Sequence, residues 1–279
     1  MTIREHIDEG IAELVLEHPP VNAFTIEDLQ TLAELLDAYK HVNDVRAVVF
    51  RSEGRGFCGG GDVKEVQALP GFEGILGQSS GSLNASLAIL ECAVPVITVV
   101  HNYCIGVGML LAGTSDIVIA SSGSTFVFAE VDNGATAGFV QGLGLLPEKR
   151  LRAAMLTCEN IDASELMQFG SIYRVVPMDE LVSEARSLAA IIAGKDPRVV
   201  RRMKASMNGT ADRDLLRRYR QELSYTFELN MLGVATERRG DFVGGRRGSY
   251  TDALAADGQD EQVANGLDSD GTDTLGERL

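Results

Sequence analysis

The sequence predicts an α/β protein in which parallel strands alternate with helices and a helical region follows. In the first 178 residues, short apolar segments are separated by glycine-rich turns and helix-start signals. This alternation is typical of parallel strands joined by crossover helices. Residues 179–230 instead keep the hydrophobic spacing of helices. A hydrophobic content of 45% is that of an ordinary globular protein, so we expect a sizeable core.

The N-terminal part predicts two strands and two helix starts. Residues 11–17 and 46–51 are expected to be strands, and the second is apolar on both faces. Residues 25–28 (Thr-Ile-Glu-Asp) have the spacing of a capping box, and residues 62–65 (Asp-Val-Lys-Glu) repeat that helix-start pattern. Helical spacing continues after the first of these at Leu29, Leu32, Leu36 and Tyr39.

The remaining elements follow from the same signals. Residues 66–85 are rich in Gly and Ser and are expected to be irregular, before a helix that ends near residue 93. Asp162 is expected to cap a helix that ends at Gly170. Further strands are expected at 95–100, 116–120, 125–128 and 175–176, with a helix at 106–112 and helices from 179 to 230.

Composition and charge exclude several classes of protein. The net charge of −15 argues against a general nucleic-acid-binding protein, which needs a basic surface. No apolar run is long enough to span a membrane, and the charged N-terminus does not resemble a secretion signal. The four cysteines have neither CxxC nor metal-binding spacing, so we expect free thiols, no metal site and a cytoplasmic protein.

The acidic charge is concentrated at the C-terminus. From residue 248 to residue 279 there are eight acidic residues and one basic residue. The segment contains few large apolar residues, so it cannot bury enough surface to offset the entropy of ordering. It is therefore predicted to be an acidic disordered tail outside the folded part.

Two glycine-rich turns are the first candidates for chemistry. They are residues 57–62 (Phe-Cys-Gly-Gly-Gly-Asp) and 103–108 (Tyr-Cys-Ile-Gly-Val-Gly), and each comes just before a predicted helix. The first N–H groups of a helix have no partner within it, so two such turns could donate to one carbonyl oxygen as an oxyanion hole. A dinucleotide fingerprint is the competing interpretation, but Leu111 occupies its third glycine position. No P-loop sequence is present.

Four motifs in this order resemble the crotonase superfamily, the enoyl-CoA hydratase/isomerase family. They are residues 55–65 (Arg-Gly-Phe-Cys-Gly-Gly-Gly-Asp-Val-Lys-Glu), 94–108 with its Gly-Val-Gly end, 125–130 (Thr-Phe-Val-Phe-Ala-Glu) and 236–243 (Thr-Glu-Arg-Arg-Gly-Asp-Phe-Val). The resemblance covers about residues 5–245. It implies a crotonase-like ββα spiral at 1–190, a C-terminal helical region at 191–247 and the tail at 248–279.

The resemblance also implies a ligand and an assembly. The expected substrate is an acyl-CoA, with coenzyme A as part of the substrate and no separate cofactor. The expected assembly is a homotrimer or hexamer.

Carried over by position, the resemblance assigns five residues to the ligand. Gly61 and Val107 would supply the oxyanion-hole N–H groups. Cys58 and Gly59 fall where backbone groups hold the adenine, and Lys64 falls near the phosphates of coenzyme A. Arg246 and Arg247 could meet the phosphates of a neighbouring subunit's ligand.

The acid/base groups depart from the usual hydratase pattern. Hydratases of the family have two glutamates; one corresponds to Glu130, but the position of the other holds Leu110. Hydration of a double bond needs a base for water and an acid for carbon, whereas a double-bond shift needs a single group. Asp132 is the candidate for a second acid. One carboxylate favours isomerase-like or other enolate chemistry.

Three functions therefore remain open. The leading interpretation is an enoyl-CoA hydratase/isomerase-type enzyme. The alternative is a C–C hydrolase that opens the ring of a cyclic β-keto acyl-CoA, because residues 169–172 (Phe-Gly-Ser-Ile) and 225–234 resemble a branch with that activity. The third is an acyl-CoA-binding homologue without catalysis.

Overall fold

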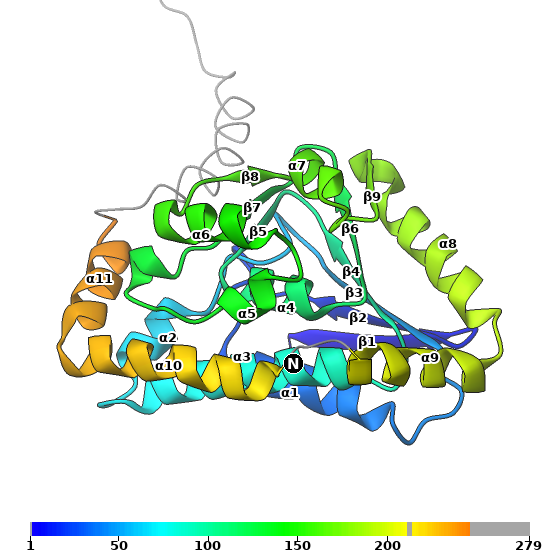
Figure 1. Cartoon of the computed structure of the whole chain (residues 1–279), viewed down its shortest axis with the longest axis horizontal. Coiled ribbons are helices and arrows are strands. Elements are labelled where there is room, and N and C mark those ends of the chain that lie inside the picture. Colours follow the sequence, from blue (N-terminus) through cyan, green and yellow to red (C-terminus); the bar gives the residue numbers. More distant parts are fainter. Residues whose placement is uncertain (1, 211–213, 246–279) are drawn as a thin grey trace, which may run out of the picture.

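The computed structural model describes residues 2–210 and 214–245. Two predictions, the acidic tail at 248–279 and the arginines Arg246 and Arg247, lie outside the described residues. The described part combines two sheets with surrounding helices (Figure 1). The predicted α/β class, with helices after the strands in the chain, is confirmed.

A mixed sheet of six strands forms the centre of the fold. Its order is β1-β2-β3-β4-β6-β9; β1 is antiparallel to β2, and the other pairs are parallel. A smaller sheet has the order β5-β7-β8. The strand pairs β4–β5 and β6–β7 each place one strand in each sheet, as expected for a ββα spiral. The bounds are β1 (Ile3–Asp8), β2 (Ile11–Leu16), β3 (Ala47–Ser52), β4 (Val96–Val100), β5 (Tyr103–Ile105), β6 (Ile117–Ser121), β7 (Thr125–Val127), β8 (Ile161–Asp162) and β9 (Arg174–Val176).

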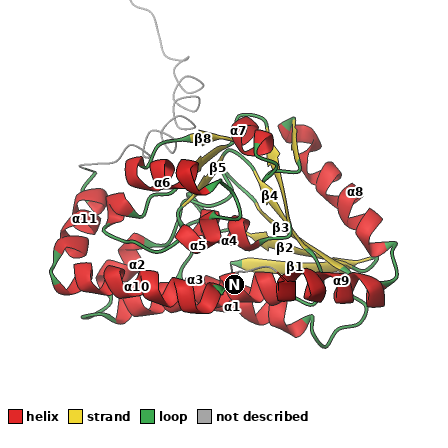
Figure 2. Cartoon of the chain, in the orientation of Figure 1, coloured by secondary structure: helices red, strands yellow, loops and turns green. Residues whose placement is uncertain are grey.

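Helices surround these sheets and form most of the C-terminal part (Figure 2). They are α1 (Ile26–Ala38), α2 (Val63–Ala68), α3 (Glu73–Glu91), α4 (Val107–Thr114), α5 (Phe139–Gly142), α6 (Glu148–Thr157), α7 (Ala163–Gln168), α8 (Leu181–Ala193), α9 (Pro197–Thr210), α10 (Leu215–Met231) and α11 (Val234–Val243). There are also two 3₁₀ turns: η1 (Val131–Asn133) precedes α5, and η2 (Met178–Glu180) precedes α8.

Both faces of the main sheet are buried. In β3, Ala47 and Val49 belong to the hydrophobic cluster formed with α8, whereas Val48 and Phe50 belong to the cluster formed with α1, α3 and α4. Successive side chains of a strand point to opposite faces, so a strand covered on both sides must be apolar throughout. This explains the apolar character of residues 46–51.

The helix start predicted at residues 25–28 is confirmed in detail. The Thr25 hydroxyl accepts from the N–H of Asp28 at 3.1 Å, and the Asp28 carboxylate accepts from the N–H of Thr25 at 3.1 Å. Leu29, Leu32 and Leu36 of α1 are fully buried, and each contributes about 1.5–3 kcal/mol of transfer free energy. Asp62 also caps α2 as predicted, but Glu65 accepts from the N–H of Ile26 instead of completing a capping box.

The expectation of an irregular segment at 66–85 is wrong, because α2 and the long helix α3 occupy most of it. The glycines of α3 allow a close approach that larger residues would prevent. A Cβ on Gly77 would lie 2.5 Å from Cδ1 of Ile26, and one on Gly81 would lie 3.1 Å from Cβ of Leu29. Packing against α1 therefore outweighs the helix propensity of about 1 kcal/mol that each glycine lacks.

The helix predicted at 162–170 forms as α7, but its capping differs from the expectation. Asp162 occupies the N-cap position, and its side chain makes no capping hydrogen bond. The carboxylate of Glu165 instead accepts from Arg150 at 2.6 Å. Gly170 follows the helix with a φ of +78°, as a glycine after a helix C-terminus commonly does.

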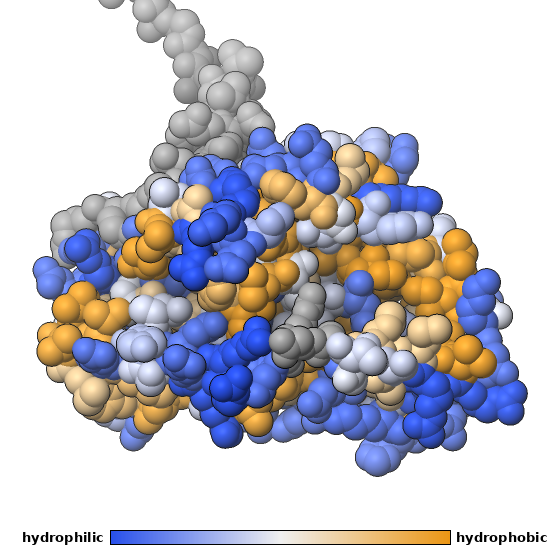
Figure 3. Space-filling model, viewed as in Figure 1, coloured by the Kyte–Doolittle hydropathy of each residue, from blue (hydrophilic) through white to orange (hydrophobic). Residues whose placement is uncertain are grey.

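The surface carries large apolar side chains among the charged ones (Figure 3). Ile191, Val199 and Met203 are each more than half exposed, at 61%, 61% and 57%. Contacts with further copies of the chain would cover such residues, but the trimer or hexamer stays a prediction. Within residues 2–210 and 214–245, no helix is both long and apolar enough to cross a membrane.

The packing of α3 makes a testable prediction about Gly74. A Cβ at this position would lie 2.2 Å from the carbonyl oxygen of Val66, so Gly74→Ala forces backbone movement. We expect it to lower the free energy of unfolding by about 1–3 kcal/mol in urea denaturation. The control is Gly209→Ala in α9, which meets nothing within 4 Å and is expected to be neutral or slightly stabilising. Equal stability of the two variants would contradict this account.

Candidate active site

A short backbone pairing holds the two glycine-rich turns together. Cys58 pairs in parallel with Cys104 of β5, and the N–H of Ile105 donates to the carbonyl oxygen of Cys58 at 2.9 Å. Gly108 packs directly on this pair, because a Cβ there would lie 2.8 Å from Cβ of Cys58. A larger residue at 108 would push α4 away from the first turn.

The tips of the two turns are in close contact. A Cβ added to Gly106 would lie 3.7 Å from Cα of Gly60 and 3.8 Å from Oε1 of Glu130. Gly106 and Gly60 have φ values of +51° and +106°, which residues with a side chain rarely adopt. Glycine is thus required at both tips for conformation, and the same turns bring Glu130 beside them.

The two N–H groups predicted to bind an oxyanion are available. Val107 is the first residue of α4, where an N–H has no partner within the helix. Gly61 lies opposite Phe24 in a short parallel bridge, but its neighbours make the hydrogen bonds of this bridge. The N–H of Phe24 donates to the carbonyl oxygen of Gly60, and the N–H of Asp62 donates to the carbonyl oxygen of Phe24. In the part of the chain that the structure describes, neither the Gly61 nor the Val107 N–H has an acceptor.

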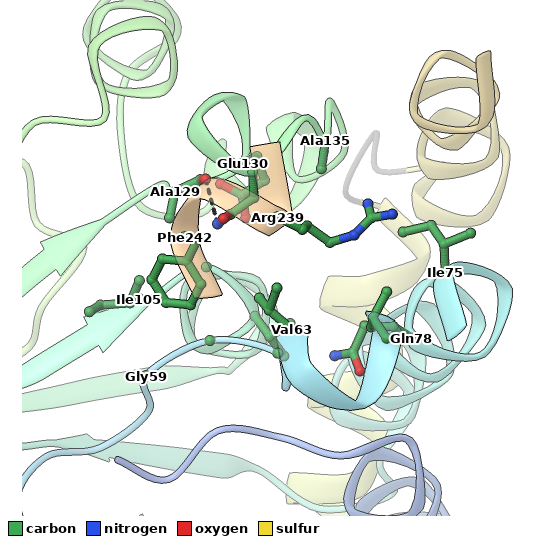
Figure 4. A pocket seen from close by; sticks show the side chains of 16 residues that line it. Gly59, Val63, Ile75, Gln78, Ile105, Ala129, Glu130, Ala135, Arg239 and Phe242 are labelled. Carbon is green, nitrogen blue, oxygen red and sulfur yellow. Dashed lines mark hydrogen bonds between the residues drawn. The ribbon is translucent and has the colours of Figure 1, made fainter. Parts of the chain in front are cut away.

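A cavity of about 140 Å³ joins these groups. Its wall is formed by residues 59–61, by α2, α3 and α11, by the turn at 105–107 and by the loop at 129–135 (Figure 4). Four residues predicted for the site lie in this wall, namely Gly59, Gly61, Val107 and Glu130. Segments far apart in the sequence thus meet at one cavity, as the sequence analysis anticipated for the two turns.

Glu130 presents a carboxyl group to the cavity. It ends the loop after β7 and immediately precedes η1. Its Oε2 is buried and has no hydrogen-bond partner among the described residues. Burial, and to a smaller extent the negative charge of Glu222, raise the pKa of Glu130 to about 8. Such a group can exchange a proton near neutral pH.

Glu222 on α10 is a second, half-buried carboxylate near the site, and sequence reasoning missed it. It accepts hydrogen bonds from the N–H groups of Gly138, Phe139 and Val140 at 2.6, 3.1 and 3.0 Å. These donors stabilise the ionised form, although burial raises the pKa of Glu222 overall. The interaction ties α10 to the chain that follows Glu130, and it places a like charge near that carboxyl.

Three other predicted residues lie outside the wall of the cavity. Cys58 is fully buried, with its N–H and carbonyl group bonded to Tyr103 and Ile105. Lys64 is exposed in the first turn of α2. Asp132 is half-buried in η1. The ligand-binding roles of Cys58, Gly59 and Lys64 stay predictions, as does the catalytic role of Asp132.

The position of the missing second glutamate is strongly apolar. Leu110 is buried in a hydrophobic cluster with Leu83, Val140 and Tyr219. A Cβ on Gly138 would lie 2.7 Å from Cδ2 of Leu110, so the leucine fills this space tightly. A carboxylate at position 110 would be costly to ionise in such surroundings.

The wall also contains two buried polar residues that were not predicted, Gln78 on α3 and Arg239 on α11. Each has a side-chain nitrogen atom with no partner among the residues that the structure describes. Arg239 lies within the motif at 236–243, which was a signal that could have found it. No group of three or more His, Cys, Asp or Glu among the described residues is arranged to hold a metal ion.

Comparison with known proteins is consistent with this site. Residues 6–231 match the family described as enoyl-CoA hydratase/isomerase. A (7aS)-7a-methyl-1,5-dioxo-2,3,5,6,7,7a-hexahydro-1H-indene-carboxyl-CoA hydrolase of Rhodococcus jostii is 40% identical over 236 residues, which cover 84% of this chain and 91% of that protein. A protein of the same name from Mycobacterium tuberculosis is 39% identical and covers 85% of this chain and 96% of its own length.

A more distant relative and a solved structure complete the comparison. A protein of Mycobacterium bovis named probable enoyl-CoA hydratase is 32% identical over 207 residues, 70% of this chain and 72% of that protein. The crystal structure of an enoyl-CoA hydratase from Mycobacterium avium subsp. paratuberculosis has a TM-score of 0.78 at 21% identity, over 88% of this chain and 97% of that chain. At this identity the structure supports the fold alone.

The environment of Glu130 makes a prediction about its titration. Its carboxyl is expected to be protonated below pH 8 and ionised above it. In Glu222→Gln a like charge is removed, so the ionised form becomes easier to reach and the pKa of Glu130 falls. Infrared difference spectroscopy of the carboxyl band during a pH titration measures this, with Glu130→Gln to identify the band. A pKa near 4.5 in the wild-type protein, or no change in Glu222→Gln, would refute the assignment.

Proposed function

The chain belongs to the enoyl-CoA hydratase/isomerase family, the crotonase superfamily, and from that premise we propose that it hydrolytically opens a ring of a cyclic β-keto acyl-CoA. The observation that carries the proposal is the identity of 40% and 39% to two indene-carboxyl-CoA hydrolases, each covered over more than 90% of its length. The sequence analysis placed the hydratase/isomerase interpretation first. These relatives favour the alternative.

The proposed substrate class follows from the chemistry in the relatives' name. That name describes a fused bicyclic ring with a methyl group, two ring carbonyls and a CoA thioester. Where a ring carbonyl carbon is bonded directly to the ring carbon that bears the thioester, the bond between these two carbons is labile. The reason is that the thioester can accept the electron pair of that bond. We propose that this chain acts on a thioester of that kind.

The thioester carbonyl oxygen would lie between the N–H groups of Gly61 and Val107. Each donor of this type contributes about 100- to 1,000-fold to the rate when negative charge develops on the oxygen. The free state of both groups and their place in one cavity wall support this role. The rigid pairing of the two turns means that little reorganisation is needed when the charge appears.

Glu130 would move one proton in two steps. In its ionised form it takes a proton from water while the hydroxide adds to the ring carbonyl carbon. The bond from that carbon to the thioester-bearing carbon then breaks, and its electron pair forms the thioester enolate. Glu130 then gives the proton to the carbon that bears the thioester. The product is a single thioester in which one ring has opened and a new carboxyl group has formed, and no reactant other than water is needed.

One carboxyl is sufficient for this sequence because the proton taken from water is the proton returned to carbon. The apolar surroundings of Leu110 agree with a single acid/base group. A double-bond shift by the same group is the second candidate function, favoured by the lone Glu130 in the cavity wall. Binding of acyl-CoA without turnover on any thioester would reject both.

Heavy-oxygen water separates the two reactions. With a bicyclic β-keto acyl-CoA as substrate, we expect a product that retains CoA, gains one water and carries one heavy oxygen in a new carboxyl group, as seen by mass spectrometry. Crotonyl-CoA is the control substrate for hydration. A product of unchanged mass would indicate a double-bond shift, and release of free CoA would indicate thioester cleavage; either result would reject ring opening.

Replacement of Glu130 tests its role as the acid/base. Glu130→Gln cannot exchange the proton, so kcat is expected to fall by about 100- to 10,000-fold. Asp132→Asn is expected to cost less than about tenfold, since Asp132 is outside the cavity wall. In the wild-type enzyme kcat/KM should rise with pH and level off above about 8, because the base form is present only above the pKa. A larger loss in Asp132→Asn than in Glu130→Gln would reverse the assignment.

A further inference from the structure

Arg239 is a buried cation that no described carboxylate neutralises. Its side chain extends from α11 across the cavity (Figure 4), and the residue is only 9% exposed. One guanidinium nitrogen, Nη2, donates to Oδ1 of Asn230 at 2.8 Å and to Oγ1 of Thr236 at 3.5 Å. These partners are neutral, and the buried Nε has no partner in residues 2–210 and 214–245. Arg239 forms no ion pair within the described part of the chain.

An unpaired buried guanidinium is unfavourable unless something else supplies the negative charge. Guanidinium groups are strongly hydrated in water, and burial without an anion costs several kcal/mol. Burial accordingly lowers the pKa of Arg239, with no carboxylate acting to raise it. The partly buried Arg51 shows the usual solution, because it pairs with Glu13 and Glu53.

Gln78 adds a second unsatisfied group to the same wall. It lies on α3 with 9% of its surface exposed, and neither its amide nitrogen nor its amide oxygen has a partner in the described part of the chain. Its amide lies against the first turn, since a Cβ on Gly61 would be 2.4 Å from Nε2 of Gln78. The cavity therefore presents a cationic donor and a neutral amide donor close to the groups proposed to hold the thioester.

We propose that Arg239 is the receptor for a carboxylate on the acyl group, with the amide of Gln78 as a further donor to its oxygens. The inference rests on the proposed function in one respect: ring opening creates such a carboxylate, on the fragment that stays attached to the thioester. Arg239 would then stabilise the negative charge on the attacked carbonyl oxygen as it forms, and would retain it in the product. The planar guanidinium, with its several N–H donors, suits a carboxylate geometrically.

The phosphates of coenzyme A are the other source of anionic oxygens. Arg239 shares its cavity with Glu130 and Val107, which are proposed to act at the reacting end of the ligand, so an acyl carboxylate is the better match. The two sources predict different behaviour toward thioesters that differ only in the acyl group. Adipyl-CoA and hexanoyl-CoA have six-carbon acyl chains, and only the first carries a terminal carboxylate.

The test is isothermal titration calorimetry with adipyl-CoA, hexanoyl-CoA and CoA. The wild-type protein is expected to bind adipyl-CoA about tenfold or more tightly than hexanoyl-CoA, because a charge-assisted hydrogen bond is made only by the former. Arg239→Gln should remove this preference and leave the affinity for hexanoyl-CoA within about twofold. Arg239→Lys should restore part of it. The matched control is Arg238→Gln, which removes the same charge from an exposed position of α11.

Two outcomes would overturn the proposal. One is equal binding of adipyl-CoA and hexanoyl-CoA by the wild-type protein, a measurement that needs no variant. The other is a loss of affinity for CoA itself in Arg239→Gln equal to the loss for adipyl-CoA, which would assign the arginine to the phosphates. These binding measurements do not depend on turnover, so absence of ring opening together with a retained adipyl-CoA preference would reject the proposed function and leave this inference intact.

Discussion

The pairing of Cys58 with strand β5 is the constraint on which the site depends. It joins two segments of chain more than forty residues apart through the bond from Ile105 to Cys58, and it sets Gly60 against Gly106. The fit of Gly108 on Cys58 fixes the start of α4 at the same place. The N–H groups of Gly61 and Val107, which have no acceptor among the described residues, are thereby held at one cavity by backbone contacts. Such contacts are less adaptable than side chains and are well suited to a preorganised electrostatic site.

The ionisable side chains around this cavity form no ion pairs with one another among the described residues. Glu130 has an elevated pKa because it is buried and near another carboxylate, and the buried Arg239 is not among the causes of its shift. Glu222 is stabilised by three N–H groups, so it can remain charged without a cation. Leu110 closes the position at which a second acid could have acted. The arrangement leaves one proton-exchanging group and one cation for the ligand, a division that suits a reaction with a carboxylate product.

Local signals predicted much of the fold but only part of the site. The capping box of Thr25, five of the six strands of the main sheet and the two turns follow from short-range sequence patterns, and they were predicted. Strand β1 was not predicted. Helix α3 was missed because its glycines are unfavourable locally and are compensated by contacts with α1. Glu222 and Arg239 were missed for a related reason. The contact between Glu222 and Gly138 spans 84 residues. No periodic pattern specifies which charged side chain of a C-terminal helix will face the site.

The central claim is that the thioester oxygen binds between two main-chain amides. A crystal structure of the protein with hexanoyl-CoA tests it most directly. The account predicts that the thioester oxygen lies within about 3.2 Å of both the Gly61 and the Val107 nitrogen atoms, with the adjacent carbon facing the carboxyl of Glu130. A thioester oxygen that contacts neither nitrogen, or an acyl chain that lies outside this cavity, would contradict the account.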